Sequence, residues 1–300
     1  MAPAPTDDPL SGDDIQLFLY LCYELHYRGL AGVDDAWEWE PSLLRLRRSV
    51  ESAFETALLE EIGEPPLAWG DVPGGLETLI SEASGPSLSA YFLRRGTLAQ
   101  FREFAIHRSG YQLKEADPHS WAIPRLSGPA KAALIEIQTD EYGSGIAGEA
   151  HADLFADTMA ALELDTTYGA YVDRLPGTTL ATTNLISFFG LHRRWRGALV
   201  GHLAVFEMTS VEPMGRYSAT LRRLGLPPLA RRFYDVHVEA DARHQIVAAA
   251  DLAGGLARSE PEVAGDIIFG AQAIMAVEGR FAAHLLDSWA AGTTSLLLPR

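Results

Sequence analysis

Residues 237–244 read HVEADARH and lie within a helical pattern that extends from Leu229 to Leu256. Successive residues of an α-helix turn by about 100°, so His237, Asp241 and His244 fall within an arc of roughly 60° on one face. The stretch therefore predicts one helix that presents two imidazoles and one carboxylate along a single stripe.

Helical periodicity continues over nearly the whole chain. Apolar residues recur every three or four positions, and the Asn-Gly or Asp-Gly turns that join alternating β patterns are missing from the sequence. Glycines at 143, 145 and 148 favour a break between two helical segments. The fold class that follows is all-α. We expect helices over residues 13–27, 41–62, 75–83, 87–107, 129–142, 151–164, 199–208, 217–224, 229–256 and 261–289.

The chain contains 300 residues, enough to bury one large core or two smaller ones, and 47% of them are hydrophobic. No repeat, low-complexity tract or obvious linker divides the sequence. We therefore expect a compact helical arrangement in which residues 1–85 form an N-terminal helical extension packed on a core domain of residues 86–300.

The charge balance excludes some classes of partner. The net charge is −16, from 40 acidic and 24 basic side chains, and it repels nucleic acid and anionic membrane surfaces. A small molecule or another protein is the expected partner.

Cys22 is the only cysteine, which excludes an intramolecular disulfide and suits a reducing cytosol. The first residues show no signal-peptide pattern, and the apolar run at 15–23 is too short to cross a bilayer. We expect a cytoplasmic protein without a transmembrane segment.

The spacing of the histidine stripe indicates what it could bind. A straight helix separates His237 from His244 by about 10.5 Å along its axis. That separation is too long for one ion but suits two metal ions roughly 3.5–4 Å apart, with Asp241 between the histidines. A two-metal centre of this kind needs further carboxylates and another imidazole from other helices, as in the di-iron carboxylate bundles.

Two residues on other segments are candidates for these positions. Glu207 in HLAVFEMTS is a lone carboxylate in an apolar helical stretch, where an unpaired charge is costly unless a cation compensates it. His151 precedes Phe155 and Met159 by four and eight residues, so this face of its helix should look inward. Both side chains are therefore candidate metal ligands.

Glu141 and Glu115 depend on breaks in the helices. Glu141 and His151 are ten residues apart, which an uninterrupted helix would separate by about 15 Å. The glycines between them allow the backbone to fold back, so that the two side chains can approach each other. Glu115 precedes Pro118, which we expect to interrupt the helix and to fix a turn near the carboxylate.

These residues resemble a known family, the haem-oxygenase-like di-iron oxidases and oxygenases, also described as iron-containing redox enzymes. The resemblance covers roughly residues 90–255 and rests on the order and spacing of KEADPHSWAIPRL, DEYGSGIAGEAHADLF, the isolated Glu207 and HVEADARH. Within the family the chain looks most like the N-oxygenase branch. The fold that the resemblance implies is a haem-oxygenase-like seven-helix bundle.

The resemblance also implies a site and its cofactors. It implies two non-haem iron ions, O2 as co-substrate, and electrons from an external reductant or redox partner. A donor set without sulfur independently fits Fe or Mn better than a structural zinc or a Cu(I) site. The expected reaction is oxygenation of a small amine or amino-acid-derived substrate, with N-oxygenation favoured by a supplementary ligand, Glu115. The core iron ligands that the resemblance implies are Glu141, His151, Glu207, His237, Asp241 and His244.

Other functions stay open at this point. The same scaffold supports oxidative C–C cleavage or desaturation of an amino acid or fatty acid, and a non-catalytic metal-binding or haem-binding helical protein is a further alternative. Interior carboxylates argue against haem, because several charges in a haem cavity would be costly. The absence of a His-Asp dipeptide argues against a hydrolytic dimetal enzyme.

Each candidate residue also has a structural alternative, as a capping, salt-bridged or hydrogen-bonded group. Glu239 lies about 200° from His237 around the helix, so we expect it to face solvent or to support a ligand rather than to bind metal. The sequence does not decide the substrate, the electron donor, or whether two chains form a homodimer.

Overall fold

Helices form all of the regular secondary structure in residues 8–298, the part of the chain that this computed structural model describes. The predicted all-α class is therefore confirmed. None of the helices in this part of the chain is long and apolar enough to span a membrane. The helices are α1 (Asp13–Glu24), α2 (Pro41–Ile62), α3 (Val72–Glu82), α4 (Leu88–Arg95), α5 (Leu98–Gln112), α6 (Asp117–Ser120), α7 (Gly128–Glu141), α8 (His151–Ala161), α9 (Gly177–Leu191), α10 (Arg196–Thr209), α11 (Val211–Arg223), α12 (Arg232–Ile246), α13 (Gly254–Ser259) and α14 (Ala264–Ala290).

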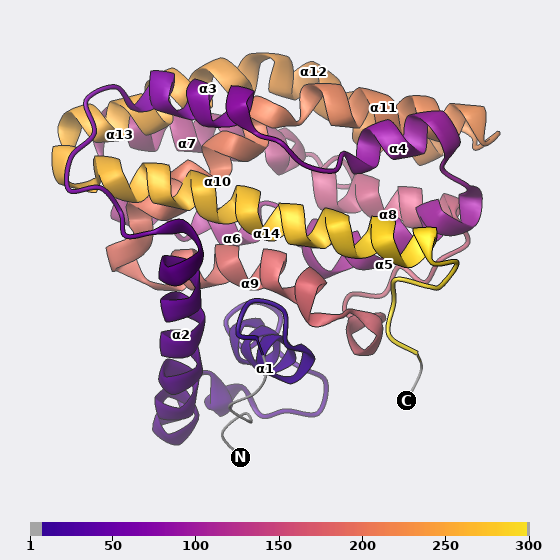
Figure 1. Ribbon diagram of the computed structural model, residues 1–300, viewed down its shortest axis with the longest axis horizontal. Coiled ribbons are helices and arrows are strands. Elements are labelled where there is room, and N and C mark those ends of the chain that lie inside the picture. Colours follow the sequence, from indigo (N-terminus) through magenta and orange to yellow (C-terminus); the bar gives the residue numbers. More distant parts are fainter. Residues whose placement is uncertain (1–7, 299–300) are drawn as a thin grey trace.

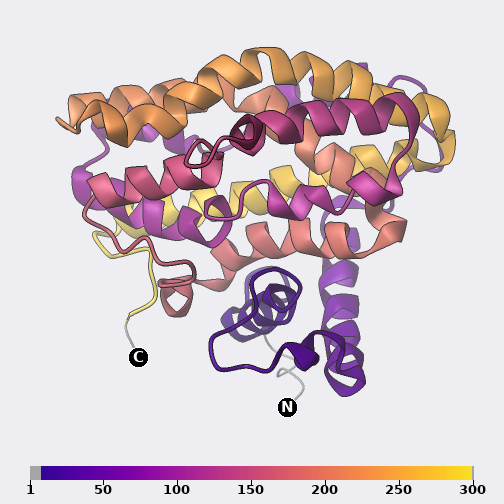
Figure 2. The same cartoon turned by 180° about the vertical axis from the view of Figure 1, so that it is seen from behind.

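The long helices run along the longest axis of the molecule, and α1 and α2 lie below them (Figure 1). The view from behind shows α1 under the bundle and α2 standing nearly upright next to α1 (Figure 2). α14 packs on α10 and α9, and α1 packs on α9. α10 is buried along most of its length, so it forms the centre of the bundle.

Local sequence signals set the ends of α2 as expected. The helix begins at Pro41, after the capping residue Glu40, and Gly63 ends it with a φ of 88°. Proline suits the first helical turn, and glycine takes a positive φ without a steric penalty. α1 is shorter than predicted, because it ends at Glu24 rather than at Tyr27.

Three other segments differ from prediction by more than a few residues at their ends. The expected helix over 87–107 is two helices, because Thr97 and Gln100 form a capping box that starts α5. α11 begins at Val211 rather than at 217, with its proline in the first turn. The pattern over 229–256 is interrupted by a π-helical turn, Val247–Ala253, between α12 and α13.

α9 was not predicted from the sequence. Thirteen of its 15 residues are buried, so the helix has no polar face that would mark its period. Four threonines add to the difficulty, because β-branched residues have a low helix propensity. Burial among α1, α10 and α14 overrides that propensity, and α9 becomes a wall of the core.

The helices before residue 85 share the hydrophobic core of the bundle. Leu19 on α1 and Phe54 on α2 are fully buried in the same cluster of side chains as Phe189 on α9 and Ile274 on α14. The division of the chain into residues 1–85 and 86–300 stays a prediction.

α10 and α14 approach closely because small residues lie at their contact. A Cβ atom on Gly201 would lie 1.8 Å from the Ile267 carbonyl oxygen, and one on Gly270 would lie 2.0 Å from that of Ala198. Only glycine fits at such distances. This contact holds α10, and with it Glu207, in the middle of the bundle.

Candidate metal centre

The structure brings together all seven predicted side chains, and each of them is more than nine-tenths buried. Four helices and one turn supply them. Glu115 lies in the turn between α5 and α6, Glu141 ends α7, and His151 begins α8. Glu207 lies near the end of α10, and α12 carries the remaining residues, His237, Asp241 and His244.

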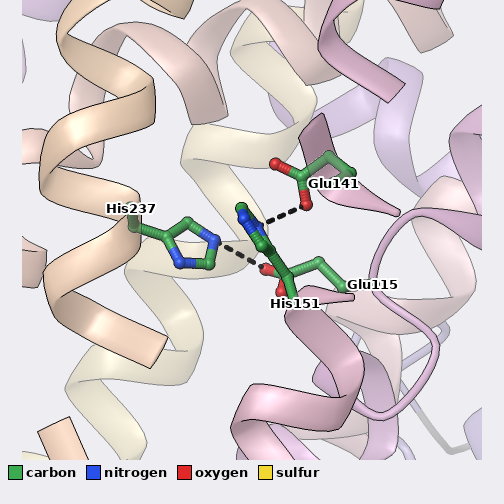
Figure 3. Close-up of side chains that lie close together, drawn as sticks. All are labelled: Glu115, Glu141, His151 and His237. Atoms are coloured by element: carbon green, nitrogen blue, oxygen red, sulfur yellow. Dashed lines mark ion pairs between the residues drawn. The ribbon is translucent and has the colours of Figure 1, made fainter. Parts of the chain in front are cut away.

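The first group of possible ligands consists of Glu115, Glu141, His151 and His237, which face one another (Figure 3). One donor atom from each of the four residues lies within 4.8 Å of the others. His151 Nδ1 is 2.9 Å from Glu141 Oε2, and His237 Nε2 is 3.6 Å from Glu115 Oε1. Two imidazoles and two carboxylates thus surround one point.

The second group consists of Glu141, Asp241 and His244, with donor atoms that again lie within 4.8 Å of one another. Glu207 adjoins this group, because its Oε2 is 3.4 Å from His244 Nδ1. Asp241 Oδ1 is 3.5 Å from the same nitrogen. Glu141 belongs to both groups, so it occupies the position of a carboxylate that could bridge two ions.

The glycine-rich loop between α7 and α8 folds back as predicted. Gly143, Ser144 and Gly145 all have positive φ angles, as does Gly148. A Cβ atom on Gly143 would lie 2.3 Å from the carbonyl carbon of Glu149, so the two sides of the loop meet at this glycine. This reversal lets α8 begin close to the end of α7, which is how the side chains ten residues apart come into contact.

The prediction for Pro118 was partly wrong. α5 already ends at Gln112, and residues 113–116 form turns that carry Glu115. Pro118 stands in the first turn of α6. Its missing N–H would be unpaired there in any case, so proline begins a helix at this point instead of interrupting one.

Hydrogen bonds orient the two histidines of α12. His237 Nδ1 lies 2.8 Å from the Phe233 carbonyl oxygen, which can only accept, so Nδ1 donates and Nε2 faces the first group. His244 Nε2 lies 3.0 Å from Asp140 Oδ2 and donates to it, which leaves Nδ1 toward the second group. Supporting bonds of this kind select the tautomer and the ring orientation that metal-binding histidines need.

Three groups that support or adjoin the site were not predicted from the sequence. Asp140 holds His244, and the Ser210 hydroxyl donates to Asp241 Oδ2. His119 and His202 form a buried pair beside the cavity, with 3.1 Å between Nε2 and Nδ1. Asp140 directly precedes Glu141 and His119 lies in the KEADPHS stretch, but neither has a spacing that reveals its partner.

The pKa values of the carboxylates reflect burial and the nearby imidazoles. Burial raises the pKa of Glu207 to about 8. Burial acts in the same direction on Glu141, but His151, His237 and His244 together outweigh it and lower the pKa of that carboxyl to about 2. The shared carboxylate is therefore ionised at neutral pH.

The pKa values of two imidazoles of the centre are raised. Burial opposes charge on His237, but Glu115 and the other carboxylates outweigh it and raise its pKa to about 10. The pKa of His244 is raised to about 11, because the neighbouring carboxylates of Asp241 and Glu207 overcome the effect of burial. Protons on these imidazoles balance the carboxylates, and a metal ion would have to displace them.

Several donor atoms in the two groups have no hydrogen-bond partner among the described residues. They are Glu115 Oε2, His151 Nδ1, Asp241 Oδ1 and His244 Nδ1. The two imidazole nitrogens have only the ion-pair contacts of 2.9 to 3.5 Å already described. A buried polar atom without a partner costs free energy, so such atoms rarely gather without a ligand. Oxygen and nitrogen donors without sulfur suit iron or manganese. The residues therefore fit a pair of such ions.

A cavity of about 500 Å³ adjoins both groups. Its wall is mostly apolar and includes Phe104, Phe206 and Met214. Arg108 and Glu278 also line it and pair with each other through two hydrogen bonds of 2.7 Å. The cavity has the size and the lining of a small-molecule site. Its wall also contains the candidate ligands Glu115, Glu141, Glu207, His237 and Asp241.

Residues 102–279 match the model of a family described as iron-containing redox enzymes, and they make up more than half of the 300-residue chain. The chain belongs to the family of iron-containing redox enzymes. The matched stretch includes all seven residues of the centre. The family assignment made from the order and spacing of the motifs is therefore confirmed.

One relative of this iron-containing redox enzyme is the nitrosourea synthase of Streptomyces achromogenes subsp. streptozoticus. The two are 24% identical over 132 residues, which are 44% of this chain and 28% of that protein. The chain thus matches less than a third of the length of this relative.

Two crystal structures of a CADD-like protein of unknown function from Nostoc punctiforme are similar in fold. One has a TM-score of 0.58 at 16% identity and covers 72% of this chain and 96% of that one. The other has a TM-score of 0.51 at 15% identity and covers 82% of this chain and 97% of that one. This likeness of fold, together with the family match, confirms the haem-oxygenase-like fold.

Proposed function

We propose that the protein is a non-haem di-iron oxygenase that uses O2 to oxidise a small amine or an amino-acid-derived substrate, by N-oxygenation. The observation that carries this proposal is the pair of ligand groups that share Glu141 and open onto one cavity. A single-ion or purely structural site would need only one of the two groups.

The ligands divide between two positions in this proposal. Glu115, His151 and His237 would hold one ion, and Glu207, Asp241 and His244 the other, with Glu141 between them. When bound, two ferrous ions would supply the electrons that reduce O2, and an external reductant would restore them.

The protein contributes orientation and exclusion of water. The Phe233 carbonyl group and the Asp140 carboxylate fix the tautomers of His237 and His244, so that each ring presents a nitrogen to the centre. The apolar wall of the cavity limits access of water to the reacting atoms, which suppresses competing reactions.

The cavity also supports the proposed class of substrate. Its volume of about 500 Å³ suits a small molecule, and its ion pair gives one end of the substrate a polar contact. Arg108 could orient a carboxylate, and Glu278 could orient an ammonium group. The name of the related nitrosourea synthase supports chemistry at nitrogen.

Oxidative C–C cleavage or desaturation is the second candidate, because the largely apolar wall also accommodates a hydrocarbon chain. The mass of the product separates the two reactions. Gain of one or two oxygen atoms on nitrogen supports N-oxygenation, whereas loss of carbon, or of two hydrogens without oxygen gain, supports the alternative.

The decisive experiment is anaerobic loading with ferrous iron, followed by exposure to O2 with a panel of amines and amino acids. We expect two ions per chain in the wild-type protein and loss of both in Glu141→Gln, with two retained in Glu163→Gln, whose side chain is 80% exposed. Absence of iron binding, a Soret band from bound haem, or hydrolysis with zinc in the absence of O2 would contradict the proposal.

A further inference from the structure

The metal centre adjoins two separate pockets, which meet different faces of α12. His237 and Asp241 line the large cavity already described. Val236, Glu239 and Ala240 line a second pocket, which lies against the loop between α7 and α8. A helical turn of about 100° per residue directs these two sets of side chains to different sides of the helix.

The second pocket is acidic. Three of its lining residues are carboxylates, Asp140, Glu149 and Glu239, and we call it the acidic pocket. Glu149 pairs with Arg232, so its charge is compensated. Glu239 is exposed and takes part in none of the ion pairs found in residues 8–298. Asp140 is partly exposed and contacts His244 directly. In the large cavity, the carboxylates other than Glu278 belong to the ligand groups themselves. Outside those groups, its only charged lining residues in the described part of the chain are Arg108 and Glu278, which neutralise each other.

The acidic pocket also reaches a candidate ligand of the centre. His151 lines it and is 99% buried, since only 1% of the residue is exposed. Its Nδ1 atom makes no hydrogen bond among the described residues and lies 2.9 Å from Oε2 of Glu141, the carboxylate that both ligand groups share. A path through the pocket therefore leads from exposed carboxylates to an imidazole of the first ligand group.

We propose that the acidic pocket is the port through which hydrated divalent metal cations reach the centre, while the substrate uses the large apolar cavity. This inference rests on the di-metal centre of the proposed function. Carboxylates at the mouth of a pocket attract cations and raise their local concentration, which speeds association. An apolar wall would force a hydrated ion to lose water without compensation.

Glu239 provides the test, because it lines the pocket without belonging to either ligand group. Asp140 is less suitable, since its loss would also release His244. We expect Glu239→Gln to slow Co²⁺ uptake by roughly three- to tenfold at low ionic strength, and Glu239→Lys to slow it further. The protein should still bind two ions, and its equilibrium affinity should change by a smaller factor than its uptake rate. Added salt at 0.5 M should remove most of the difference in uptake rate between the variants and wild type, because salt screens charges over a distance that falls to ~3 Å at 1 M.

Glu60→Gln is the matched control, because it makes the same change of net charge on an exposed residue of α2, far from α12 (Figure 1). Uptake is followed by stopped-flow absorbance of Co²⁺, and equilibrium binding by titration. Equal uptake rates in wild type, Glu239→Lys and Glu60→Gln, with two ions bound at equilibrium, would overturn the port and leave the centre intact. Failure of the wild-type protein to bind Co²⁺, Fe²⁺ or Mn²⁺ would overturn both.

Discussion

A buried ion pair joins the N-terminal helix to the segment that carries Glu115. The side chains of Glu24 on α1 and Lys114 are 2% and 1% exposed, and the ammonium group donates to the carboxylate. Tyr168 donates a second hydrogen bond to Glu24, and the ammonium lies 4.4 Å from the centre of the Tyr27 ring. Because Lys114 directly precedes Glu115, this pair should contribute both to stability and to the position of a ligand.

Glu24→Gln removes the carboxylate charge and leaves the ammonium buried without a counter-ion. Breaking a buried pair in this way costs about 3–5 kcal/mol. The total stability of a protein is about 5–15 kcal/mol, so the variant should lose a large part of it. We expect Tm to fall by roughly 5–15 °C.

The loss of stability in Glu24→Gln should depend on pH, and the protonation of Lys114 sets the direction of that dependence. Burial lowers the pKa of its amine from 10.5 to about 7, so above neutral pH the unfolded chain holds this proton more tightly than the folded one. Stability rises with pH wherever the unfolded state binds more protons. Loss of Glu24 should lower this pKa further, so the two folded proteins differ in proton binding only below about pH 7. The defect of Glu24→Gln should therefore grow as the pH falls below 7 and should stay constant between pH 7 and 10.

Urea unfolding followed by circular dichroism measures the effect. Glu163→Gln removes a carboxylate from an exposed pair with Arg102 and should change the unfolding free energy by less than about 1 kcal/mol. The double variant Glu24→Leu with Lys114→Met, which leaves no unpaired charge, should be more stable than Glu24→Gln. The unfolding free energy of Glu24→Gln should fall by about 3 kcal/mol or more. A fall of less than about 1 kcal/mol would show that the argument from burial is wrong.

Three other predictions follow from the packing and the charges. Gly201→Ala should lower the unfolding free energy by about 1–3 kcal/mol, because its Cβ atom would collide with the backbone of α14. Gly279→Ala has open space around it and should raise the unfolding free energy by about 0.5–1 kcal/mol. Urea titration of both variants measures the two changes. Ser210→Ala should weaken metal affinity about tenfold without changing circular dichroism, and unchanged affinity would refute its support of the centre. The pKa values of His237 and His244 are raised to about 10 and 11, so protons compete with metal ions for these imidazoles at neutral pH. The metal affinity should rise by about tenfold per pH unit for each proton displaced. Calorimetry in buffers of different ionisation enthalpy counts the protons released on binding, and a count of zero would contradict the raised pKa values.

The parts of the site that were predictable depend on residues close together in the chain. The shared face of His237, Asp241 and His244 follows from the helical repeat, and the approach of Glu141 to His151 follows from the glycines between them. Both expectations required only that a helix or a reversal form locally. The structure places these side chains as those local rules require.

The missed contacts depend on how helices pack. Asp140 meets His244 across 104 positions of the chain, and Ser210 meets Asp241 across 31. No local periodicity reports such a distance. α9 was missed for a related reason, because a helix surrounded by other helices keeps no polar face in its sequence.

Helical period, turn-forming glycines and the chemistry of the ligand side chains were readable from the order of residues, because each acts within a few positions. Packing alone set which carboxylate is shared between the two ligand groups, which groups orient the histidines, and which pocket is acidic. These properties arise where distant helices meet, and they depend on distances of a few ångströms that the order of residues does not record.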